Sequence, residues 1–204
     1  MNRRGDQVLA VGLMSGTSLD GIDAALIETD GEGVVRNVAF RGEAYSPDAR
    51  DMLRDAAALA LTLDRPRIGR EIQAAADLVT RSHILAVRAL LAEAHVAAAE
   101  VAVVGFHGQT IAHRPDRGWT WQIGDGQAMA TALALPVVSD FRAADVAAGG
   151  QGAPLIPVYH RALTAGMAGP VAVLNLGGVG NISWLGAGET DVIAFDTGPA
   201  NGLI

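Results

Sequence analysis

The chain has 204 residues, of which half are hydrophobic and 18% are charged, and its formal charge is −7. This composition is typical of a folded domain with a sizeable core, and its acidity and scarcity of aromatic residues argue against a nucleic-acid partner. Because the sequence lacks cysteine and lysine, disulfides, thiolate metal sites, a P-loop lysine and Schiff-base chemistry are excluded. No apolar run is long enough to cross a membrane, and no convincing secretion signal is present, so we expect a cytoplasmic protein without a membrane partner.

The first two predicted strands, residues 8–13 and 24–28, flank a loop that is rich in glycine, hydroxyl and carboxylate side chains. The intervening sequence, GLMSGTSLDGID at residues 12–23, is longer than the two to five residues of an ordinary hairpin loop. Glycines let backbone amides approach a ligand closely, hydroxyl groups can donate to phosphate oxygens, and Asp20 or Asp23 could hold Mg²⁺ through water. The pattern favours a phosphate-binding loop, and an ordinary solvent-exposed turn is the alternative.

Strands and helices alternate along the next part of the chain. Turn residues at 30–33 precede a third strand, and apolar spacing predicts helices over residues 47–63 and 70–96. The apolar runs at residues 101–108 and 136–141 predict two further short strands, each followed by polar residues. This alternation indicates an α/β domain.

Polar side chains follow both of these short strands. His107 and Gln109 lie at the carboxyl end of the first, and Asp140 and Arg142 lie at the carboxyl end of the second. Because α/β sheets bind ligands at the carboxyl ends of their strands, these residues are candidate ligand contacts. A core histidine satisfied by the backbone is the alternative for His107. Arg142 could either hold a substrate carboxylate by a bidentate fork or form an ion pair with the neighbouring aspartates.

The plan of the opening segment recurs near the end of the chain. Residues 171–185 again read as strand, glycine-rich loop and strand, which predicts a duplicated architecture with a first lobe over residues 1–167 and the start of a second over 168–204. The motif FDTGPAN places Asp196 at the end of an apolar strand. A carboxylate in that position is typical either of a general base or of a helix cap.

Five motifs carry a family resemblance. GLMSGTSLDGID, FHGQT, DFRAADVAAGGQGAPL, LNLGGVGNIS and FDTGPAN occur in this order and resemble the anhydro-N-acetylmuramic acid kinases. The resemblance implies an α/β fold with an actin-like ATPase (ribonuclease H-like) lobe, followed by the start of a second similar lobe. In this superfamily two glycine-rich hairpins hold the phosphates of ATP. The implied ATP-binding residues are Gly16, Thr17, Ser18, Leu19, Asp20, Gly21, Ile22, Asp23, Gly177, Gly178 and Asn181.

The resemblance also implies a reaction. The family uses water to open 1,6-anhydro-N-acetylmuramic acid and transfers the γ-phosphate of ATP to O6, in the recycling of peptidoglycan. Asp196 is then the base that activates the water, and the implied sugar contacts are His107, Gln109, Asp140 and Arg142. The cofactors are ATP and Mg²⁺, with Asp20 near the metal through water. We expect a homodimer whose other partners are the sugar and ATP.

Members of the family are considerably longer than this chain. We therefore expect the chain to stop inside the second lobe and to lack the adenosine pocket. Two other functions fit the motifs. One is a truncated, non-catalytic lobe that binds phosphate or sugar, and the other is a sugar or acetate-type kinase of the same superfamily.

Overall fold

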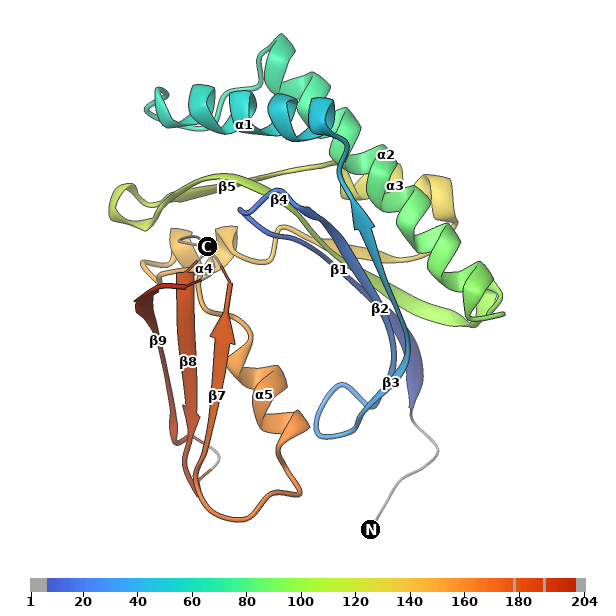
Figure 1. Ribbon diagram of the computed structural model, residues 1–204, viewed down its shortest axis with the longest axis vertical. Helices are drawn as coiled ribbons and strands as arrows, with labels where there is room; N and C mark the ends of the chain where they lie inside the picture. The colour runs from blue at the N-terminus through green and yellow to red at the C-terminus, as the bar shows by residue number, and fades with distance from the viewer. Residues whose placement is uncertain (1–6, 178, 189, 201–204) are drawn as a thin grey trace.

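The computed structural model describes residues 7–177, 179–188 and 190–200, and in this part the chain folds into two β-sheets with helices (Figure 1). The larger sheet has the strand order β3-β2-β1-β4-β5, with β6 also paired to β4. Its strands are β1 (Val8–Ser15), β2 (Gly21–Thr29), β3 (Val35–Ala44), β4 (Val101–Arg114), β5 (Trp119–Ile123) and β6 (Val137–Ser139). The smaller sheet has the order β7-β8-β9. Its strands are β7 (Val171–Leu176), β8 (Val179–Leu185) and β9 (Val192–Pro199).

The helices lie on both sides of the larger sheet. They are α1 (Pro47–Leu61), α2 (Arg70–Glu93), α3 (Gly126–Leu133), α4 (Ala143–Ala147) and α5 (Pro157–Leu163), with short 3₁₀ turns η1 (Ala98–Glu100) and η2 (Pro115–Arg117). Figure 1 shows α2 and α3 along one side of the larger sheet and the smaller sheet, with α5, on the other. Strand β4 is parallel to β1 and β6, whereas the other pairs are antiparallel, so the larger sheet is mixed. No helix in the described part of the chain is long and apolar enough to span a membrane.

The two predicted long helices are confirmed, with ends set by local chemistry. The Ser46 side chain accepts a hydrogen bond from the backbone N–H of Ala49, and Pro47 occupies the first turn, so α1 begins with a favourable cap. Helix α2 ends at Glu93 and does not reach residue 96. His95 there adopts a left-handed backbone with φ of 56°, which the α-helix does not accommodate.

The hydrophobic core lies between the larger sheet and the helices that cover it. Its largest fully buried apolar side chains come from the sheet and from α1, α2 and α3, and they are Ile22, Leu26, Leu53, Ile72, Leu90, Phe106 and Met129. Full burial of such a side chain stabilises the fold by about 1.5–3 kcal/mol. The larger sheet is thus a fixed platform for the loops at its edge.

Three strands, β1, β2 and β4, are longer than the sequence predicts. Strand β1 does not break at Gly12 but continues to Ser15, and β2 begins at Gly21, so the first loop comprises residues 16–20 only. The extensions form because Met14 pairs with Asp23 through backbone groups, which every residue type carries. Strand β4 likewise runs past His107 to Arg114, since its second half forms a hairpin with β5.

One face of the smaller sheet, called here its polar face, carries a row of polar side chains across the three strands, whereas the opposite face is apolar. Cross-strand pairing brings Asn175 opposite Asn181 and Asn181 opposite Asp196, so these three side chains form a row on one face. The opposite face carries exposed apolar side chains, namely Leu174, Trp184, Ile193 and Phe195. Asp196 lies within β9 and not at its end, because the strand continues to Pro199.

Candidate ligand-binding cleft

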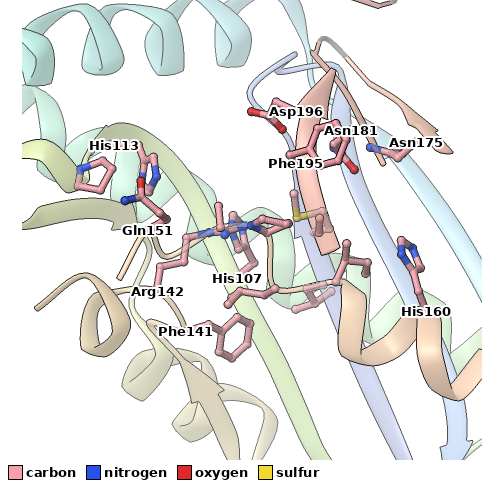
Figure 2. Close-up of a pocket in the computed structure, with 18 residues that line it drawn as sticks. His107, His113, Phe141, Arg142, Gln151, His160, Asn175, Asn181, Phe195 and Asp196 are labelled. Carbon is pink, nitrogen blue, oxygen red and sulfur yellow. The ribbon is translucent and has the colours of Figure 1, made fainter. Parts of the chain in front are cut away.

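A cleft opens between the two sheets (Figure 2). It consists of two adjoining cavities of about 870 Å³ and 390 Å³, a size suited to small-molecule ligands. The residues that line both cavities come from both sheets and from the loops after β6, and they are Met14, His107, His113, Arg142, Ala153, Asn175, Asn181 and Asp196. The shared lining means that the two cavities form one continuous cleft.

The first loop, residues 16–20, borders the smaller cavity. Gly16, Thr17 and Ser18 line it. The backbone N–H of Leu19 donates to the carbonyl of Gly16 over 3.2 Å, and Leu19 adopts a left-handed backbone with φ of 57°. The Ser18 hydroxyl donates to the Asp20 carboxylate over 2.8 Å. The loop is therefore a compact turn that borders the cleft, in which the single hydroxyl hydrogen of Ser18 is donated to Asp20.

Three residues predicted to bind ATP belong to β2 and not to the loop. Gly21 is held close to β3, and a Cβ there would lie 2.3 Å from the carbonyl oxygen of Glu43. Ile22 is buried in the core. The side chain of Asp23 is largely exposed. Partial desolvation of its carboxyl group, followed by the neighbouring charge of Asp20, raises its pKa. Gly21 and Ile22 thus have structural reasons to be present, whereas Asp23 adds a second carboxylate beside the loop.

The second glycine-rich turn joins β7 to β8 and borders the same cavity. Gly177 and Val179 line the smaller cavity together with Asn175 and Asn181. Gly178, which the sequence assigns to the ATP site, lies outside the described residues. The two hairpins of the sequence analysis are thus brought to one cavity from two different sheets.

Asp196 lies on the polar face of the smaller sheet and lines both cavities. Figure 2 shows it beside Asn181 and Asn175, on one side of the cleft, with Arg142 and His107 across from it. The pairing of β8 with β9 shifts directly after Asp196, so that Thr197 is an extra residue in the strand. Such β-bulges are frequent next to active sites, where they aim a side chain.

His107 and Arg142 form a hydrogen-bonded pair at the cleft, in which the imidazole is neutral and the guanidinium is charged. The Nδ1 atom of His107 lies 2.9 Å from the carbonyl oxygen of Gly108 and must donate to it, which leaves Nε2 to accept from Arg142 Nε at 3.0 Å. Burial and the charge of Arg142 lower the pKa of His107. Arg142 also donates from Nη1 to the carbonyl of Gly152 over 2.6 Å, so its guanidinium is fixed from two sides.

The aspartates near Arg142 do not pair with it. Asp140 is exposed, has a left-handed backbone with φ of 60°, and is absent from the lining of both cavities. The carboxylate of Asp145 accepts from the backbone N–H of Gly152 over 2.7 Å and so holds the glycine-rich bend. Among the described residues, Arg142 forms no ion pair, which removes the ion-pair alternative and leaves its outer edge available to an anion.

Gln109 is brought beneath the first loop rather than into the cleft. Its side chain is 0% exposed, and it contacts Ser15 and the carbonyl of Gly16. It is not among the residues that line either cavity. The structure therefore brings together the loop, the second turn, Asp196, His107 and Arg142, while Gln109 and Asp140 lie outside this set.

His160 of α5 is a cleft residue that the sequence analysis missed. Its ring is buried, lines the larger cavity, and lies 3.0 Å from the hydroxyl of Ser183 on β8. Burial lowers its pKa. No local pattern in the segment PVYHRAL marks this histidine, since only the packing of α5 on β8 brings it to the cleft.

The described part of the chain has no cluster of metal-ligating side chains. No group of three or more His, Cys, Asp or Glu side chains in that part of the chain lies close enough together to hold one metal ion. Asp20, the predicted water-mediated contact of a metal, is exposed and accepts from Ser18.

The fold and the cleft define an α/β protein with a polar cleft between two sheets, each of which contributes one glycine-containing hairpin. Comparison with known sequences is more specific. The family model described as anhydro-N-acetylmuramic acid kinase matches residues 8–204. The chain therefore belongs to the anhydro-N-acetylmuramic acid kinase family.

Two relatives and one solved structure are similar to the chain. An anhydro-N-acetylmuramic acid kinase of Rhizorhabdus wittichii is 72% identical over 97% of this chain and 54% of its own length. One of Zymomonas mobilis is 55% identical over 97% of this chain and 55% of its own length. The chain thus spans about half the length of these curated relatives. YeaZ from Pseudomonas aeruginosa has a TM-score of 0.35 at 15% identity, over 95% of this chain and 68% of its own, which is too low to carry an argument.

Proposed function

We propose that this chain supplies the sugar site and the phosphate loops of a kinase that opens 1,6-anhydro-N-acetylmuramic acid and phosphorylates O6 with ATP. The observation that carries the proposal is the cleft itself. Two glycine-containing turns border one cavity, and the carboxylate of Asp196 shares that cavity with the fixed guanidinium of Arg142. A phosphate chain, a sugar carboxylate and an attacking water each have a partner of suitable chemistry there.

The architecture fits the actin-like ATPase plan. We assign residues 1–167 to a first lobe and residues 168–204 to the start of a second, and the position of one hairpin on each sheet supports this division. We further propose a cytoplasmic enzyme that acts in peptidoglycan recycling and forms a homodimer. The sugar and ATP are its small-molecule partners.

The residues divide the chemistry between them. Asp196 takes a proton from water, and the water oxygen forms a bond to the anomeric carbon of the sugar. The bond from that carbon to O6 breaks, and O6 keeps its electron pair. O6 then attacks the γ-phosphorus, whose bond to ADP breaks. Arg142, held by His107 and Gly152, binds the lactyl carboxylate and so orients the sugar.

The donors beside the first loop fit a magnesium ion that is carried mainly by the nucleotide. Asp20 and Asp23 are oxygen donors, and the charge of Asp20 contributes to the raised pKa of Asp23, so a cation here would relieve their repulsion. Mg²⁺ usually keeps several waters and binds one or two carboxylates together with substrate phosphates. Asp20 would hold it through water, and the ion would offset the charge on the phosphates.

A hybrid enzyme provides the test. In it, this chain replaces the matching segment of the Rhizorhabdus wittichii relative, which is 72% identical. We expect the hybrid to phosphorylate the anhydro sugar, and Asp196→Asn to lower kcat by about a hundredfold or more, because an amide cannot accept a proton. Affinity for the sugar, measured by calorimetry, should change less than about twofold.

The control and the rival functions are built into the same assay. Asp55→Asn, on the exposed surface of α1, should leave kcat unchanged. A hybrid that phosphorylates N-acetylglucosamine or acetate in preference to the anhydro sugar would favour another kinase of the superfamily. A hybrid that binds ligands without turnover would favour a binding lobe. Near-normal kcat in Asp196→Asn would refute the assignment of the base.

A further inference from the structure

A buried chain of hydrogen bonds lies directly beneath the first loop. It links Tyr45, which follows β3, to Ser15 at the end of β1 and to Gln109 in β4. All three side chains are buried, with exposed fractions of 6%, 1% and 0%. Polar side chains at this depth are costly unless each is hydrogen-bonded, so their arrangement needs an explanation.

The donors and acceptors fix the direction of the chain. Ser15 donates its hydroxyl hydrogen to Gln109 Oε1 and therefore accepts from Tyr45, whose hydroxyl lies 3.1 Å away. The Nε2 atom of Gln109 then donates to the carbonyl of Gly16 over 3.1 Å and to that of Thr110 over 3.3 Å. Each of the three side chains is hydrogen-bonded, and the last bond of this buried group is made to the first loop.

Both ends of the loop are held by this group of residues. The carbonyl of Gly16 accepts from Gln109 and from the backbone N–H of Leu19, so that both of its lone pairs are used. At the other end, the backbone N–H of Tyr45 donates to the carbonyl of Asp20 over 3.1 Å. Leu19 between them has a left-handed backbone, which costs about 1–3 kcal/mol and persists only where the surroundings enforce it.

The inward carbonyl also orients the next amide. In a trans peptide the C=O and the following N–H point in opposite directions. Because the Gly16 carbonyl points at Gln109, the N–H of Thr17 points away from Gln109, on the side where Thr17 and Ser18 are exposed and line the smaller cavity. The hydrogen bond from Gln109 therefore fixes the direction of the Thr17 backbone donor in a loop that borders that cavity.

We propose that Tyr45, Ser15 and Gln109 are positioning residues that hold the first loop in the shape that binds the nucleotide phosphates. This inference rests on the proposed function, since it takes the loop to be a phosphate site. Gln109 then acts on ATP through the loop and does not contact the sugar. Its 0% exposure and its absence from the cleft lining favour this role over the sugar contact predicted from the sequence.

Steady-state kinetics of the hybrid enzyme distinguish the two roles. Gln109→Met keeps the length of the side chain but removes the acceptor and the donor of its amide, and we expect it to raise KM for Mg·ATP about tenfold while KM for the sugar changes less than about twofold. Gln73→Met, on the exposed face of α2, is the matched control and should change neither. A rise in KM for the sugar alone would overturn the proposal. An equal rise in both would also overturn it, because a general structural role predicts that result.

Tyr45→Phe tests whether Tyr45 and Gln109 act on the loop through their shared hydrogen bonds to Ser15. It removes only the hydroxyl that donates to Ser15, and the Tyr45 backbone bond to Asp20 remains. We expect a smaller rise in KM for Mg·ATP, about threefold, and a double variant with Gln109→Met that is less than multiplicative. Tyr159→Phe, on α5, is its control. Fully multiplicative effects would show that the two side chains act separately.

Hydrogen exchange separates this inference from the proposed function. The backbone N–H of Leu19 donates to the Gly16 carbonyl. Gln109→Met should therefore accelerate hydrogen exchange at the Leu19 amide about tenfold in the ligand-free hybrid, and this result does not depend on which substrate the enzyme uses. Unchanged exchange would refute the positioning role even if the enzyme is the proposed kinase. Accelerated exchange in a hybrid that binds no nucleotide would instead show that the buried chain orders the loop but that the proposed function has failed.

Discussion

We expect His83 to make the stability of this protein fall in mild acid. The imidazole is fully buried, its Nδ1 donates to the carbonyl of Val79 over 2.7 Å, and Nε2 has no partner among the described residues. The ring meets Phe106 edge to face, with centroids 5.1 Å apart. Burial is the main reason why its pKa is lowered from 6.5 to about 4.

The sign and size follow from this shift. Between pH 6.5 and 4 the unfolded chain binds a proton at His83 and the folded chain does not, so stability is lost as the pH falls through this range. At 1.36 kcal/mol per unit of pKa, the loss between pH 7 and pH 4 is about 3 kcal/mol. That is a large part of the 5–15 kcal/mol that holds a typical domain together.

Urea unfolding of this chain, followed by tryptophan fluorescence at pH 7, 6, 5 and 4, measures the effect. His83→Leu replaces the imidazole in α2 by an apolar side chain of similar size that cannot titrate. Its unfolding free energy should therefore fall by about 3 kcal/mol less than that of the wild type, while carboxylates common to both proteins cancel. The control is the exposed His95, replaced by Asn because Asn tolerates a left-handed backbone. Parallel curves for wild type and His83→Leu would refute the reasoning.

Three further outcomes follow from the structure. Arg142→Lys should weaken sugar binding about tenfold and ATP binding less than about twofold by calorimetry, because lysine loses the planar fork; equal affinities would make Arg142 purely structural. Gly21→Ala should cost about 1–3 kcal/mol in urea unfolding, since its Cβ meets a carbonyl oxygen of β3 at 2.3 Å, whereas Gly33→Ala, which meets nothing within 4 Å, should not. Leu174→Ser with Phe195→Ser should reduce self-association of this chain in light scattering, and scattering unchanged from the wild type would contradict a role for the exposed face.

The elements of the fold were predictable where hydrophobic periodicity is strong. Both long helices and most of the strands follow from apolar spacing, and the structure contains them, whereas β5 and the shorter helices α3, α4 and α5 were not predicted. The extent of β1 and β2 was not predictable, because residues 14–15 and 21–23 belong to a segment rich in glycine, hydroxyl and carboxylate groups and enter the sheet through backbone pairing. A glycine- and hydroxyl-rich segment looks like a loop by composition even where it is a strand.

The sequence motifs identify the segments that form the candidate site, but they do not show which side chains within one motif face the cleft. His107 and Gln109 are two residues apart, so a regular strand would present both to the same side. The register of β4 against β1 shifts between the pairs of Leu13 and Ser15, and Gly108 there has φ of 70°. This irregularity turns His107 to the cleft and Gln109 beneath the loop. No pattern of residue types reveals such a shift, since it depends on two strands that are distant in the sequence.

The position of Asp196 likewise depends on pairing more than on its own neighbours. Side chains alternate along β9, so a slip of β9 by one residue against β8 would turn Asp196 to the other face and bring Phe195 or Thr197 into the row of Asn175 and Asn181. The extra residue Thr197 then alters the alternation only beyond Asp196, where β8 turns toward the glycine-rich loop. The exposed apolar face and the carboxylate in the cleft are thus two consequences of one strand register.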